Sequence, residues 1–129
     1  MKLIEEVARH FHDNSLGTLS TDLFYGHLPD VEADTSILVR DTGGMEPDKD
    51  LLDIKYPTFQ VFIRAKTYGA GKDILDSVRS LLHGVISETL IPDGIHYRRI
   101  HALAEGGHIG KNEAGYHEFS INFEAEIVE

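Results

Sequence analysis

The feature that most constrains the fold is a long alternation of apolar and polar side chains at residues 116–128, YHEFSINFEAEIV. Side chains alternate between the two faces of a β-strand, so this pattern predicts a strand with one buried and one polar face. At ~3.3 Å per residue the strand would run roughly 40 Å, which is long for a small domain. The expected core face carries Phe119, Ile121, Phe123, Ala125 and Ile127. The other face, a largely acidic ladder that must meet water or another molecule, carries Glu118, Ser120, Asn122, Glu124 and Glu126.

The middle of the chain predicts a second strand followed directly by a helix. Residues 57–67 alternate between apolar and polar side chains, with Pro57 at the first strand position, where its missing N–H matters least. Residues 70–87 carry an apolar stripe at helical spacing, interrupted only by Gly84. This unit therefore predicts a helix that packs on the sheet without bringing any catalytic group with it.

Weaker patterns complete the expected order of elements. They predict a helix at 2–13, strands at 21–26, 36–41 and 94–104, and loops at 42–56 and 105–115. The first loop is long enough to indicate a functional or mobile segment. We therefore expect one α+β domain over residues 1–129, in the order α-β-β-β-α-β-β, with a mostly antiparallel sheet and both helices packed on one face.

Composition excludes several classes of protein. The chain has no cysteine, so disulfides, thiolate metal sites and cysteine nucleophiles are excluded. The net charge of −10 argues against a surface that neutralises phosphates by ion pairing. No apolar run approaches the ~20 residues of a membrane helix, and Glu5 and Glu6 interrupt any secretory signal near the N-terminus. We expect a protein that stays in the cytoplasm where it is made and does not enter a membrane.

The candidate chemical motifs each lack the spacing that their chemistry needs. The eight histidines show no metal-ligand spacing; His96 and His101, five apart on an expected strand, point to opposite faces. Residues 69–72 (Gly-Ala-Gly-Lys) lack the length and the following hydroxyl of a phosphate-binding loop. The aspartates within 48–53 lack the glycine and the glutamate of a calcium-binding EF-hand. The sequence thus predicts no catalytic residue, no metal and no cofactor, and leaves the histidines a possible part in tuning assembly.

Several stretches, taken in their order and spacing, resemble one known family. They are 17-GTLSTDLFYGHLPD-30, 41-DTGG-44, 57-PTFQVFIRAKTYGAG-71, 82-LHG-84 and 109-IGKNEAGYHEFSINFEAEI-127. Together they span almost the whole chain, which resembles the tail terminator, or minor capsid, proteins of long-tailed bacteriophages and prophages. The resemblance implies a structural virion protein, not an enzyme. It implies a hexameric ring that caps the tail tube, stops its polymerisation and offers its other face for head–tail joining.

The partners implied by the resemblance are further copies of the chain, the tail tube protein and the head-completion or connector protein. DNA would only pass through the lumen, and assembly would take place in the host cytoplasm before the protein enters the virion tail or neck. Two alternatives remain open: another adaptor of the same neck, and a small module that binds a metal or ligand through histidines. The expected interface residues are Glu118, Asn122, Glu124, Glu126, Arg64, Lys66, Met45, Asp48, Lys49, His108, Lys111 and Asn112.

Overall fold

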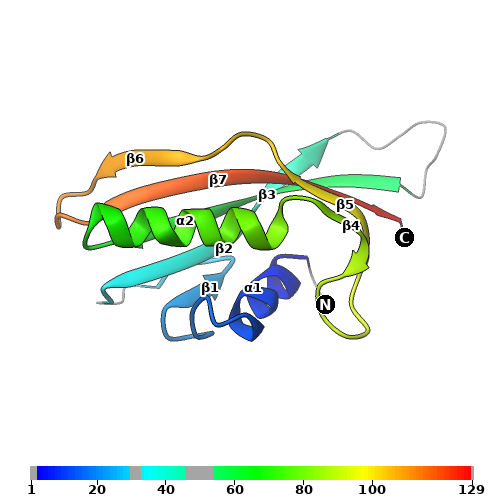
Figure 1. Ribbon diagram of the computed structural model, residues 1–129, viewed down its shortest axis with the longest axis horizontal. Helices are drawn as coiled ribbons and strands as arrows, with labels where there is room; N and C mark the ends of the chain where they lie inside the picture. The colour runs from blue at the N-terminus through cyan, green and yellow to red at the C-terminus, as the bar shows by residue number, and fades with distance from the viewer. Residues whose placement is uncertain (1–2, 30–32, 46–53, 129) are drawn as a thin grey trace.

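The computed structural model describes residues 3–29, 33–45 and 54–128. The elements in chain order, shown in Figure 1, are α1 (Leu3–Asp13), β1 (Leu23–Tyr25), β2 (Thr35–Met45), β3 (Ile54–Ala65), α2 (Tyr68–Leu82), β4 (Val85–Thr89), β5 (His96–Ala102), β6 (Gly107–Lys111) and β7 (His117–Val128). The α+β class, the mostly antiparallel sheet and the two helices are confirmed. The structure adds β4 and β6, two strands that the sequence patterns did not predict.

One sheet of seven strands contains β3 and β7 at its centre. The strand order is β1-β2-β3-β7-β5-β4, with β6 also paired to β7, and every pair is antiparallel except β1 with β2. The partner of β7 on one side is β3, in a register that runs from Ala65 opposite His117 to Ile54 opposite Val128. On its other side β7 pairs first with β6 and then with β5, which lie end to end along it (Figure 1).

Both helices cover the same face of this sheet, as Figure 1 shows. The core between the two layers includes the stacked rings of Phe59 and Phe123, whose centroids lie 5.3 Å apart. The apolar alternation predicted for the last strand is confirmed, since Phe119, Ile121, Phe123 and Ala125 are all buried. Neither described helix is long and apolar enough to cross a membrane.

Helix α1 is attached to the start of β5 by a buried carboxylate. Glu6 is only 1% exposed, although charged side chains of an amphipathic helix usually face the solvent. Its oxygens accept hydrogen bonds from the backbone N–H of Ile95 at 3.1 Å and from the hydroxyl of Tyr97 at 3.2 Å. These bonds satisfy a charge that would otherwise be costly to bury. Glu6 therefore fixes the position of α1 against the start of β5.

The predicted bounds of the loop at 42–56 are wrong at both ends. Strand β2 continues to Met45 and β3 begins at Ile54, so that Gly44 lies opposite Pro57 in the ladder. The register of the β2–β3 pair shifts between Asp41 and Gly44. The two adjacent glycines, a pattern typical of a turn, therefore lie at an irregularity within the strand. Pro57 is accordingly not the first residue of its strand; it lies beside this irregularity, where a missing N–H is tolerated. Residues 46–53 lie outside the described part of the chain.

The expected loop at 105–115 and the expected helix at 70–87 also need correction. Residues 107–111 form β6, because Gly106, at φ 80°, lets the chain cross close over Ser120 and Ile121 before it pairs again with β7. Helix α2 ends at Leu82, and Gly84, at φ 90°, turns the chain into β4. The apolar residues after Gly84 fit a helical stripe, but they belong to a strand that pairs with β5.

Candidate interaction surface

The face of the sheet away from the helices carries most of the polar residues that the sequence singled out. The glutamates of β7 point to this face because their neighbours in the strand point into the core. Neighbouring strands add basic and aromatic side chains at matching register positions. We call this the helix-free face; it includes Arg40, Gln60, Phe62, Arg64, Arg98, Arg99, His101, Glu118, Ser120, Asn122, Glu124 and Glu126.

The acids of β7 are not a bare ladder, because each has a basic residue from a neighbouring strand beside it. A carboxylate oxygen of Glu126 lies 3.2 Å from the guanidinium of Arg98, and one of Glu124 lies 4.0 Å from the ring of His101. Glu118 lies opposite Arg64 in the ladder. The side chains of Glu124 and Glu126 are only 16% and 18% exposed. The face as defined carries four arginines and three glutamates, so it is close to neutral in a chain of charge −10.

Two arginines of the helix-free face stack on aromatic rings. The guanidinium of Arg64 lies 5.3 Å from the ring centroid of Tyr116, and that of Arg40 lies 5.7 Å from the centroid of Phe62. Arg40 also donates a hydrogen bond of 2.7 Å to the side chain of Gln60. Stacked and bonded guanidinium groups keep fewer rotamers than free ones. The helix-free face therefore presents an ordered polar surface and not a set of mobile charges.

A second group of expected residues lies on the helix side, where α2 begins. His108 and Lys111 of β6 sit beside β7, and the rings of His108 and Tyr68 pack 5.3 Å apart between centroids. The Nε2 atom of His108 lies 3.0 Å from the Nδ1 atom of His117. Partial burial lowers the pKa of His117, and the charge of Lys111 and the neighbouring His108 lower it further. This end of the subunit therefore carries a cluster of aromatic and basic groups.

The other five expected residues have local roles or lie wholly or partly outside the described part of the structure. Asn112 builds the turn between β6 and β7, since its side chain accepts from the N–H of Tyr116 at 2.9 Å. Lys66 follows β3 and lies 3.1 Å from a carboxylate oxygen of Asp34. Met45 is the last residue of β2, and its side chain is not described. The expected residues Asp48 and Lys49 also lie outside the described residues. The predicted set thus divides between the helix-free face and the two ends of the sheet.

The edge strands expose apolar side chains that sequence patterns did not single out. Among the described residues, β1, β4 and β6 each pair with only one other strand. Each of them carries one large exposed apolar residue: Tyr25 at 44%, Ile86 at 70% and Ile109 at 60%. An unpaired strand edge with exposed apolar groups is a natural site for pairing with another chain. Only the strand assignments reveal this, since single exposed apolar residues are common in any sequence.

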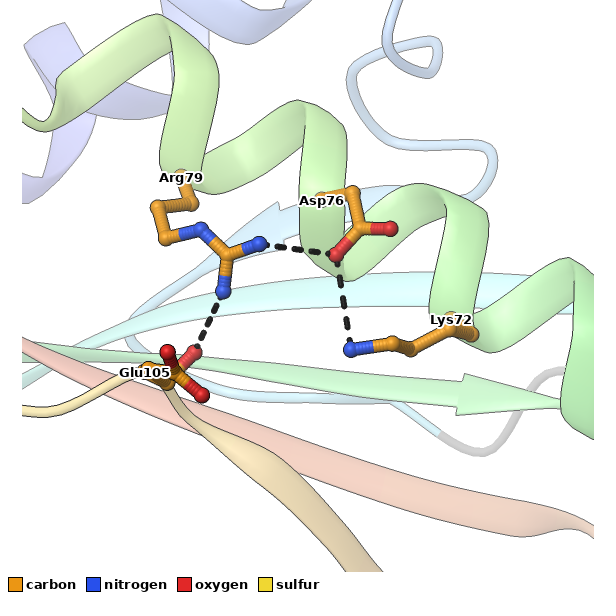
Figure 2. Close-up of polar contacts among 4 residues, drawn as sticks. All are labelled: Lys72, Asp76, Arg79 and Glu105. Atoms are coloured by element: carbon orange, nitrogen blue, oxygen red, sulfur yellow. Dashed lines mark hydrogen bonds and ion pairs between the residues drawn. The ribbon is translucent and has the colours of Figure 1, made fainter.

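Helix α2 fixes the position of the β6 edge through a polar network, which Figure 2 shows. Arg79 lies 3.0 Å from a carboxylate oxygen of Asp76 and donates a 3.0 Å hydrogen bond to the backbone carbonyl of Glu105. Lys72 lies 3.5 Å from the same oxygen of Asp76. Because Glu105 belongs to the connection between β5 and β6, the network ties that connection to the helix.

The described residues expose polar side chains on the helix-free face and apolar side chains along the sheet edges. They contain no group of three or more histidines, aspartates or glutamates placed to hold a metal ion. An open cleft lies between the end of α1 and the side of α2, lined by Asn14, Ser15, Leu16, Asp76, Ser77, Ser80 and Leu81. The family model for the bacteriophage tail terminator protein matches residues 10–129.

The chain belongs to the bacteriophage tail terminator family. It is therefore a structural component of a phage-type tail and not an enzyme. A chain in the structure of a native gene transfer agent virion shares the fold, with a TM-score of 0.74 and 14% identity over 98% of this chain and 95% of that one. A search of curated protein sequences finds no match. The resemblance drawn from the sequence is thus confirmed at the level of the family.

Proposed function

We propose that this tail terminator acts as a ring, hexameric as the family resemblance implies, that caps the tail tube and stops its growth. The other side of the ring would receive the head-completion protein. Membership of the terminator family carries this proposal. The similar chain from the gene transfer agent virion comes from an assembled particle, which fits the same role.

The two opposite edges of the sheet support a head-to-tail ring. A closed ring of identical subunits needs two different, complementary patches on opposite sides of each subunit. The β1 edge and the edge formed by β4 and β6 lie at opposite ends of the strand order. Their exposed side chains, Tyr25 on one side and Ile86 with Ile109 on the other, offer apolar area for such a contact. We propose that these edges join neighbouring subunits.

Contacts through the sheet edges would turn one face of the sheet toward the ring axis. We propose that the helix-free face lines the channel and that the helices lie on the outside. Its paired charges suit a passage for DNA, because a face close to neutral neither binds phosphates strongly nor repels them. In this arrangement Glu118, Asn122, Glu124, Glu126 and Arg64 border the channel, and DNA passes without being held.

The remaining expected interface residues lie at opposite ends of the long central strands. Near the start of β7 lie His108, Lys111, Asn112 and Lys66. Met45, the last residue of β2, lies at the opposite end, where β3 begins opposite Val128, the last residue of β7. Eleven residue steps of ~3.3 Å separate these ends by roughly 35 Å. We propose that one end meets the tail tube and the other meets the connector; the expected residues Asp48 and Lys49 lie outside the described part of the chain.

The decisive experiment is deletion of the gene from its phage or prophage, with the progeny imaged by negative-stain electron microscopy. We expect overlong, uncapped tubes beside DNA-filled heads that lack tails. Tails of normal length lying detached from heads would instead assign the chain to the head side of the neck. Intact infectious particles would contradict both roles.

Complementation with edge variants tests the ring contact itself. Ile109→Asp places a charge on the β6 edge, where it would be desolvated in a subunit contact. We expect this variant to fold but to leave tubes uncapped. Ser77→Asp makes the same change of charge at an exposed position of α2 and serves as the control. Equal tail lengths for the two variants would exclude the β6 edge from the ring contact.

A further inference from the structure

Two histidines from neighbouring strands bring their ring nitrogens together at the start of α2. In the ladder His108 of β6 lies opposite Phe119 and His117 of β7 lies opposite Lys111, so the two histidines are diagonal neighbours, and a hydrogen bond of 3.0 Å joins Nε2 of the first to Nδ1 of the second. Their ring planes meet at 42°. The ring of Tyr68 packs edge-on against both, with centroids at 5.3 Å and 6.1 Å. Paired strands and a packed aromatic ring thus hold both imidazoles in place.

Three other histidines of the described residues, His83, His96 and His101, have partners of a different kind. His83 accepts a hydrogen bond from the backbone N–H of Ala102, and His96 lies 3.4 Å from the hydroxyl of Ser87. His101 lies beside the carboxylate of Glu124. Among these contacts, only His108 and His117 direct one imidazole nitrogen toward another. The pair arises from the β6–β7 hairpin, which explains why spacing along the sequence did not reveal it.

The distance between the two nitrogens suits two neighbouring positions around one metal ion. With metal–nitrogen bonds of about 2.0–2.1 Å, a separation of 3.0 Å corresponds to an angle of roughly 95° at the metal. Square-planar and octahedral ions need about 90° between adjacent ligands, whereas a tetrahedral ion needs the nitrogens slightly further apart. We propose that His108 and His117 form a two-histidine chelate for a divalent transition ion of the nickel or copper class.

The chemistry around the pair sets the character of this site. Imidazole nitrogens are favoured ligands of these ions, and the exposed side of His108 leaves room for water at the remaining coordination positions. Binding of the ion would replace the hydrogen bond between the rings, because both facing nitrogens must then be unprotonated and direct their lone pairs at the ion. Lys111, directly opposite His117 in the ladder, places a positive charge nearby and weakens the binding of a cation. The site is therefore an open, water-completed chelate of moderate strength.

Calorimetric titration of the untagged chain with NiCl₂ tests this site, with MgCl₂ as the reference ion. We expect saturable binding of one Ni²⁺ per chain and no comparable binding of Mg²⁺, which prefers oxygen ligands. His108→Ala and His117→Ala should each weaken the binding by about tenfold or more. Lys111→Gln should tighten it, because the substitution removes the repelling charge.

The matched control is His96→Ala, which removes an exposed histidine whose ring lies 3.4 Å from the hydroxyl of Ser87. This variant should bind Ni²⁺ as the unmodified chain does, and circular dichroism should show that all four variants remain folded. Equal losses in all three histidine variants would show scattered surface binding and overturn the chelate. A chain that binds no Ni²⁺, or a Lys111→Gln variant that binds it more weakly, would overturn it as well.

Discussion

At the residue scale, the buried carboxylate of Glu6 is the contact on which the position of α1 depends most. Glu6→Ala leaves the N–H of Ile95 and the hydroxyl of Tyr97 without their acceptor in a buried place. We expect a loss of roughly 2–4 kcal/mol in the free energy of unfolding, measured by urea denaturation. Glu5→Ala is the control; its 3.8 Å ion pair with Arg9 is partly exposed and should contribute less than about 1 kcal/mol. Similar losses for both would contradict this role of Glu6.

The partner of Glu6 gives the fold a sensitivity to alkaline pH. Burial raises the pKa of Tyr97 far above its usual value, and the charge and hydrogen bond of Glu6 raise it further. The unfolded chain therefore loses this proton at lower pH than the folded chain does. The contribution to stability is complete below about pH 10, the usual pKa of tyrosine, and declines as the pH rises above it. In Tyr97→Phe, the fall in melting temperature between pH 9 and 11 should be smaller than in the unmodified chain; an equal fall would exclude Tyr97 as its source.

At the element scale, the sequence predicts those strands and helices whose pattern has a single interpretation. The alternation around Phe119 and Phe123 can only be a strand with one buried face, and the structure has it there. The prediction that the helix continues past Gly84 is wrong, because the two apolar residues that follow fit a helix and a strand equally well. The β6 strand was missed because its glycines resemble a loop until β7 is known as its partner. Strand pairing joins residues that are far apart in the sequence, so single patterns do not reveal it. The ion pairs between β5 and the acidic residues of β7 depend on the same pairing and were missed for the same reason.

The packing of α2 on the sheet depends on a glycine that a helix would normally disfavour. A Cβ atom at Gly71 would overlap the ring of Phe119, whereas one at Gly69 would meet no other atom within 4 Å. Gly71→Ala should therefore lower the free energy of unfolding by about 1–3 kcal/mol, because the helix must move off the sheet. Gly69→Ala should change it in the opposite direction, by up to about 1 kcal/mol, through helix propensity alone. Chemical denaturation of the two variants measures this, and a stabilised Gly71→Ala would show that α2 has room to shift.

At the scale of the whole molecule, a single rigid sheet links every surface that the proposed ring needs. The central strands β3 and β7 extend from the α2 end to the β2–β3 end, and the edge strands pair outward from β2 and β7. Subunit contacts at the edges and docking contacts at the ends would therefore share one framework. Burial of the core on one face leaves the other free to line a channel, and its charges are balanced within that same face.

This balance leads to a prediction about the passage of DNA. Glu124→Lys with Glu126→Lys removes the partners of His101 and Arg98 and makes the helix-free face strongly positive. In a ring lined by this face the added lysines would bind phosphates, so we expect slower DNA ejection, and a delay that shrinks as salt is raised. Asp13→Lys with Asp73→Lys makes the same change of charge on exposed helix positions and should leave the ejection rate unchanged. Unchanged ejection by the first variant, in particles with intact rings, would show that another surface lines the channel.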